Sequence, residues 1–114
     1  MSTMTEDFET HVRDTADGYV STLNLLWDHI DRDEEFEGES PIDYLDAMPL
    51  EIVWEPGEPF AVVLGIGGPH VEITGGGRQG GYELTVYWGS NPVVRRGEAI
   101  TRTGEYFREL YEQD

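Results

Sequence analysis

Several absences limit what this chain of 114 residues can be. It contains no cysteine, which excludes a disulfide framework and a thiolate metal site, and nothing indicates an oxidising compartment. No apolar run approaches the roughly 18 to 20 residues that span a bilayer, and the acidic stretch MSTMTEDFE lacks the basic region of a secretory signal. We therefore expect a cytoplasmic protein that folds as one domain over residues 1–114.

Lysine is also missing. The 7 basic residues are all arginine and oppose 24 Asp and Glu, so the formal net charge is −17. Neutralisation of phosphates by Lys and Arg drives nucleic-acid binding, so we expect no direct contact with DNA or RNA. The same charge favours a cationic partner, and one such class is a protein whose surface is built to hold phosphates.

The acidic residues are unevenly distributed. Residues 1–58 hold 17 acids and 2 arginines, whereas residues 59–114 hold 7 acids and 5 arginines. A salt-adapted proteome, or a GC-rich genome that favours Arg codons, would also produce acids without lysine. General adaptation should charge every exposed surface, however, so the asymmetry favours a localised acidic face.

The stretch from Leu50 to Gly89 alternates apolar and polar residues, which is the period of half-buried strands. It divides into LEIVWE, FAVVLGIG, VEIT and YELTVYWG, separated by short connections that contain Pro and Gly. The pattern predicts four antiparallel strands in a meander. A short extended edge is expected at residues 93–96, outside these four strands.

Helices are predicted on both sides of this sheet region. Apolar residues at spacings of three and four indicate a long helix from a cap at Thr5 to about Arg32. Ser40 before Pro41 predicts a short helix to Ala47. A closing helix is predicted over 98–113, and its predicted inner side consists of Ile100, Thr103, Phe107, Leu110 and Tyr111. The fold class is therefore α+β, with a long helix, a short helix, four strands and a C-terminal helix packed on the sheet.

The strand pattern also suggests a carboxylate pair. Pairing Val71 with Leu84 keeps the apolar residues on one face and places Glu72 directly across from Glu83. Opposed like charges are destabilising, so we expect this pair to face water or a cation. Acid/base catalysis by the two glutamates would require a cleft and separated pKa values.

Other stretches match known binding motifs only in part, because the residues around them do not fit those motifs. The glycines of residues 75–80 match the dinucleotide fingerprint, but the loop leads into a strand rather than a helix, and the absence of lysine excludes a Walker A site. Asp31, Asp33 and Glu35 begin like a calcium loop, yet Phe36 stands where Gly is required. The scattered histidines predict no metal site, and we expect no cofactor and no catalytic residue.

Four segments resemble a family of small acidic proteins encoded by phages and other mobile elements of bacteria. They are GGPHVEI at 67–73, LTVYWG at 84–89, EYFRELY at 105–111 and DYLD at 43–46. The sequence departs from that pattern at His70, where Asn is expected, and in its enlarged glycine loop. The resemblance implies a counter-defence role of the anti-CRISPR or antirestriction type and supplies no catalytic residue.

The leading hypothesis is an interaction protein, monomeric or homodimeric, that inhibits a host nucleic-acid-binding defence protein partly by nucleic-acid mimicry. Its alternatives are a salt-adapted accessory domain without mimicry and a small hydrolase that uses Glu72 and Glu83. No membrane association is expected. The predicted partner-binding residues are Asp28, Asp31, Asp33, Glu34, Glu35, Glu37, Glu39, Asp43 and Asp46.

Overall fold

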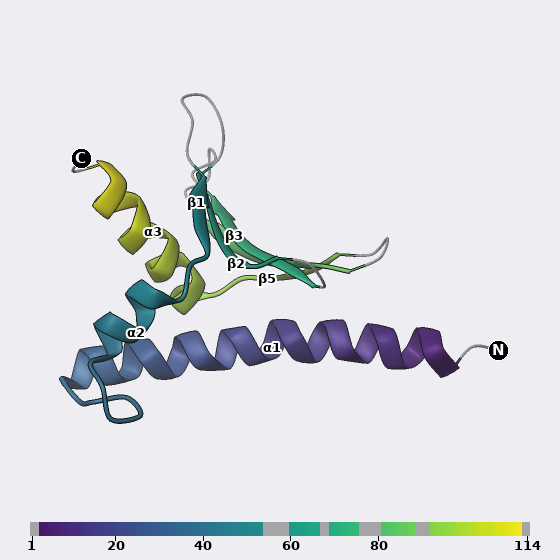
Figure 1. Cartoon of the computed structure of the whole chain (residues 1–114), viewed down its shortest axis with the longest axis horizontal. Helices are drawn as coiled ribbons and strands as arrows, with labels where there is room; N and C mark the ends of the chain where they lie inside the picture. Colours follow the sequence, from purple (N-terminus) through teal and green to yellow (C-terminus); the bar gives the residue numbers. More distant parts are fainter. Residues whose placement is uncertain (1–2, 54–59, 67–68, 76–80, 89–91, 113–114) are drawn as a thin grey trace.

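The structure is a computed structural model that describes residues 3–53, 60–66, 69–75, 81–88 and 92–112 (Figure 1). The fold is α+β, as predicted. Its elements in chain order are α1 (Thr3–Arg32), α2 (Pro41–Ala47), β1 (Glu51–Val53), β2 (Phe60–Gly65), β3 (His70–Gly75), β4 (Tyr82–Tyr87), β5 (Val93–Arg95) and α3 (Glu98–Glu112).

Helix α1 forms because its apolar residues follow the helical period. Val12 is 3% exposed, and Ala16, Leu23 and Leu26 are fully buried, so the predicted stripe faces the core. The helix ends at Arg32, as predicted. Thr5 lies inside the helix rather than at its cap, because α1 already begins at Thr3.

The strands form one antiparallel sheet in the order β1-β2-β3-β4-β5, which confirms the meander. The prediction of four strands was wrong, because the segment expected to be only an edge is β5 and pairs with β4. Leu84 faces Arg95, and Val86 faces Val93. Three residues are too few to establish an alternating pattern in the sequence.

The predicted register between β3 and β4 was also wrong. Glu72 faces Thr85 rather than Glu83, and Glu83 faces Thr74, so the two carboxylates are not directly opposed. The true register differs from the predicted one by two residues. Such a shift leaves every side chain on the same face of the sheet, and alternation alone therefore could not distinguish the two registers.

An irregularity in β2 explains a further difference. The register shifts between Val63 and Gly65, so that Gly65 faces Val71 and Leu64 is the additional residue. The strand ends at Gly65. Ile66, which the alternation of the segment FAVVLGIG predicts to point inward with Phe60 and Val62, therefore lies beyond the strand and is 63% exposed. At the other end of the predicted sheet region, Leu50 precedes β1 and is 61% exposed, while Trp54 lies outside the described residues.

Helix α3 packs against the sheet, and a glycine allows the close approach. A Cβ on Gly104 would overlap the ring of Tyr82, which is buried on β4. Ile100 and Phe107 point inward, as predicted. Leu110, also predicted to point inward, is 42% exposed. It lies two residues before the end of α3 at Glu112.

Helices α1 and α3 lie on the same side of the curved sheet, and α2 packs against α1 (Figure 1). The two long helices are joined directly, since Nε1 of Trp27 donates a 2.9 Å hydrogen bond to Oγ1 of Thr103. That hydroxyl in turn donates to the carbonyl of Ala99 at 2.7 Å. The core therefore lies between one face of the sheet and these helices, and the segment that connects α1 to α2 lies at one end of the molecule.

Candidate functional site

The predicted partner-binding residues gather at the end of the molecule where α1 meets α2. We call this region, residues 28–46, the acidic end. Asp28 and Asp31 lie in the final turns of α1, Asp43 and Asp46 lie in α2, and the others lie in the connection between the helices. All nine are exposed. The structure thus brings together the residues that the sequence singled out as a group.

The connection begins with a defined C-terminal cap of α1. The amide of Asp33 donates to the carbonyl of Ile30 at 3.1 Å, and the amide of Glu34 donates to the carbonyl of His29 at 2.9 Å. These two bonds are those of a Schellman motif, whose central residue adopts a left-handed conformation and is usually Gly. Here Asp33 occupies that position with φ of 58°.

An aromatic side chain anchors the rest of the connection. Phe36 is 8% exposed and packs edge-on against His29 and Tyr44, with ring centroids 5.3 Å and 5.0 Å away. Its backbone exchanges hydrogen bonds of 2.8 Å and 3.0 Å with Glu39. Between them, Glu37 has φ of 49°. The segment is therefore a tight turn held at its centre by Phe36, with carboxylates on both sides of the anchor.

Two of the predicted residues make specific contacts within the chain. Both oxygens of Asp31 accept hydrogen bonds from Arg102, each 2.9 Å long, and the guanidinium also lies 4.2 Å from the centre of the Trp27 ring. These hydrogen bonds lower the pKa of Asp31. Asp46 accepts a 2.6 Å hydrogen bond from the hydroxyl of Tyr106. Burial, with a further contribution from this bond, raises the pKa of Tyr106 to about 12.

The other predicted carboxylates are less engaged. Glu34 lies 3.9 Å from Nδ1 of His29. The remaining six form no hydrogen bond or ion pair through their carboxylates with any side chain in the described part of the chain; they are Asp28, Asp33, Glu35, Glu37, Glu39 and Asp43. The acidic end therefore combines two carboxylates held by the fold with six directed to solvent.

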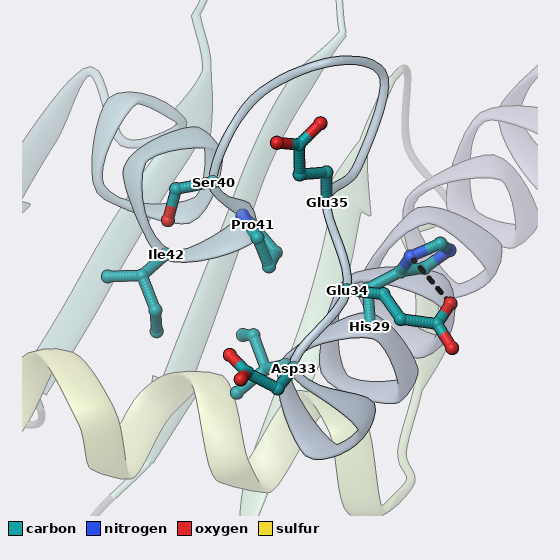
Figure 2. Close-up of a pocket in the computed structure, with 8 residues that line it drawn as sticks. His29, Asp33, Glu34, Glu35, Ser40, Pro41 and Ile42 are labelled. Atoms are coloured by element: carbon teal, nitrogen blue, oxygen red, sulfur yellow. Dashed lines mark ion pairs between the residues drawn. The ribbon is translucent and has the colours of Figure 1, made fainter.

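A cleft of about 350 Å³ opens between the end of α1 and the start of α2 (Figure 2). In Figure 2 the side chains of Pro41 and Ile42 point toward Asp33 across this space, and Glu34 lies beside His29. Nδ1 of His29 is buried and has no hydrogen-bond partner among the described residues. Sequence reasoning missed these apolar walls and the histidine, because their proximity depends on the turn that Phe36 anchors.

The alternative sites are not assembled as the sequence suggested. Glu83 pairs with Arg96, while Glu72 lies 3.8 Å from Nε2 of His70. Over the described residues, no three or more His, Cys, Asp or Glu side chains are placed to hold a metal ion, which includes the calcium-like trio that begins at Asp31. The fingerprint-like glycines at 76–80 lie outside the described residues.

No protein-family model, curated protein or solved structure matches this chain. None of the helices, over the residues that the structure describes, is long and apolar enough to cross a membrane.

Proposed function

We propose that this protein acts by binding another protein, with the acidic end docking on a cationic surface that normally holds nucleic acid. The observation that carries the proposal is the cluster of six solvent-directed carboxylates at the acidic end, four of which lie in the connection whose shape is fixed by a buried aromatic residue, Phe36. Such a surface presents negative charge at defined positions, as a nucleic-acid backbone does. Catalysis is not part of the proposal.

The acids occupy positions that oppose folding. The C-terminus of a helix carries a partial negative charge, so Asp28, Asp33 and Glu34 near the end of α1 are electrostatically unfavourable there, although His29 and Arg32 offset part of the effect. A left-handed backbone conformation lowers the stability of the fold by about 1–2 kcal/mol for a residue other than Gly, and by less for Asp. Asp33 and Glu37 both adopt this conformation. Charges needed only for solubility could lie where they oppose neither the helix nor the backbone.

Residues that reduce stability persist where function requires them, and this distinguishes the proposal from general salt adaptation. Duplex DNA carries one negative charge per roughly 1.7 Å of its axis, so a dense carboxylate cluster can occupy several phosphate subsites of a groove. Complementary charge would also steer the two proteins together before contact. The finer form of the proposal is that the target is a host defence protein and that this chain is its phage or mobile-element inhibitor.

A matched pair of triple variants tests the proposal. Glu35, Glu37 and Glu39 are changed to Gln in the first variant. In the second, exposed acids elsewhere are neutralised by Asp14→Asn, Glu105→Gln and Glu109→Gln, so both variants lose the same charge. Each protein is immobilised and exposed to a host lysate, and captured proteins are identified by mass spectrometry with and without excess duplex DNA.

We expect nucleic-acid-binding proteins to be captured by the wild type and by the second variant, and to be released by DNA. Capture by the first variant should fall several-fold, mainly because the two proteins associate more slowly. The capture that remains should depend less on salt concentration. Equal capture by the two variants, or capture that DNA does not affect, would contradict the proposal.

The salt-adapted alternative is tested separately, through the salt dependence of folding. A domain of that kind requires screening of its repelling acids to remain compact. We expect the purified protein to show its helical circular dichroism and a cooperative melt in low-salt buffer. If both appear only above about molar salt, salt adaptation explains the acids better.

A further inference from the structure

The cleft between α1 and α2 is lined by two kinds of surface. Ile30, Pro41 and Ile42 are half-buried and present apolar walls, whereas Asp33 and Glu35 are exposed and supply carboxylates. Figure 2 shows these two acids on opposite sides of the Pro41 ring. The cleft therefore combines apolar walls with negative charge on two of its sides.

The size of the cleft limits what can occupy it. Its volume is about 350 Å³. Pockets that hold whole small molecules span roughly 300–1,000 Å³, so this cleft lies at the lower end of that range. One long side chain suits this space better than a segment of backbone with its side chains.

The negative charge of the cleft is not neutralised within the described part of the chain. The carboxylates of Asp33 and Glu35 form no ion pair there, and among the described residues no arginine lines the cleft. The cleft also lies beside the C-terminal end of α1, where the helix dipole places partial negative charge. Two independent sources of negative potential therefore favour a cation at this position.

The apolar walls restrict the kind of cation. A metal ion gains nothing from them, and over the described residues no three or more His, Cys, Asp or Glu side chains are placed to hold one. Lys and Arg carry an aliphatic stem that can lie along apolar surface while the charged group remains outside it. The guanidinium of Arg is more weakly hydrated than an ammonium group, and its five donors form a fixed fork. It can therefore reach carboxylates on two sides of the cleft with a smaller loss of hydration.

We propose that this cleft binds one arginine side chain of the partner protein, with its stem against Pro41 and Ile42 and its guanidinium between Asp33 and Glu35. This inference rests on the proposed function and deepens it, since it names the group by which the cationic surface is held. Arginine is a common phosphate-binding residue and is enriched among the residues that dominate interface energies. The same arginine can thus hold a phosphate of nucleic acid in one complex and enter this cleft in the other.

The probes are short glycine-flanked peptides whose central residue is Arg, Lys or citrulline, which keeps the shape of Arg without its charge. Each is titrated into the labelled full chain while amide NMR shifts and the Kd are measured. The cleft variant is Asp33→Asn with Glu35→Gln, and Asn tolerates the left-handed conformation of position 33. The matched control is Glu37→Gln with Glu39→Gln, which removes the same charge from residues that do not line the cleft.

We expect the Arg peptide to shift the amides of Asp33, Glu35 and Ile42. The cleft variant should weaken its binding about fivefold, whereas the matched control should weaken it less than about twofold. The Lys peptide should bind more weakly than the Arg peptide, and the citrulline peptide more weakly still. The inference is overturned if the two variants weaken binding equally, if citrulline binds as well as Arg, or if no peptide shifts the cleft amides.

The same two variants in the lysate capture separate this inference from the proposed function. Capture of nucleic-acid-binding proteins that falls only in the cleft variant supports both. An equal fall in both variants would keep the acidic end as the docking surface but overturn the cleft as an arginine site. Binding of the Arg peptide at the cleft, without capture of any nucleic-acid-binding protein, would support the arginine site and contradict the proposed function.

Discussion

The guanidinium of Arg102 donates two hydrogen bonds, each 2.9 Å long, to the two carboxylate oxygens of Asp31. This paired geometry joins the last turn of α1 to α3 and leaves the guanidinium stacked 4.2 Å from the Trp27 ring. Asp31, one of the carboxylates of the acidic end, therefore contributes to the contact between α1 and α3. Asp31 therefore stabilises the fold, whereas the carboxylate of Asp33 makes no such contact in the described part of the chain.

We expect this pair to make the stability of the fold sensitive to acid. The hydrogen bonds from Arg102 lower the pKa of Asp31 below its ordinary 3.8. The stabilisation is therefore present above that value and is lost as pH falls through the lowered pKa of the folded state. Chemical unfolding measured from neutral to strongly acidic pH should show a shallower decline in Asp31→Asn than in the wild type. A decline as steep in Asp31→Asn as in the wild type would contradict this account.

Tyr106 should produce an opposite dependence at alkaline pH. Its pKa is raised from 10.0 to about 12 in the fold, mainly by burial. The unfolded chain thus ionises first, and this contribution to stability is present below pH 10 and lost as pH rises toward 12. Tyr106→Phe should flatten the stability curve in that window, although it also removes the hydrogen bond to Asp46. An unchanged alkaline slope would contradict the assignment.

Two helical glycines should respond oppositely to alanine. Gly18 in α1 is exposed, with no atom near the position of an added Cβ, so Gly18→Ala should raise the free energy of unfolding by about 1 kcal/mol. Gly104 in α3 is buried, and a Cβ there would overlap the Tyr82 ring. Gly104→Ala should therefore destabilise despite the same gain in helix propensity. Thermal or urea unfolding of the two variants checks both signs, and a loss of stability in Gly18→Ala would contradict the account.

Much of this fold could be predicted from local patterns. The helix period located the end of α1 at Arg32, and the Ser-Pro start located α2, although the Ser40 side chain makes no capping hydrogen bond. Alternation found four of the five strands. It could not determine the β3–β4 register, because a shift of two residues preserves every face, and it could not detect the bulge at Leu64.

The candidate site was predictable in composition but not in form. Counting charges located the acidic residues, whereas the pairing of Asp31 with Arg102 joins positions 71 residues apart and has no local signal. The anchor was equally invisible, since Phe36 stands alone among acids in the sequence. In the calcium-like segment, Phe36 is simply a mismatch for Gly. The structure instead makes it the residue on which the turn depends.

At Asp33 we expect stability and the proposed binding to oppose each other. This residue occupies the left-handed position of the helix cap with φ of 58°, where glycine is least strained. It also places a negative charge at the negative end of α1. Asp33→Gly removes both effects, so we expect the free energy of unfolding to rise by about 1 kcal/mol in urea denaturation. Glu35→Gly is the control, because Glu35 lies two residues further on and outside the left-handed positions, and it should bring no comparable gain.

If the proposed function is correct, Asp33→Gly should also slow association with the captured partner. A variant that is no more stable than the wild type would show that Asp33 is not strained, and one that gains stability and binds normally would remove this residue from the interface.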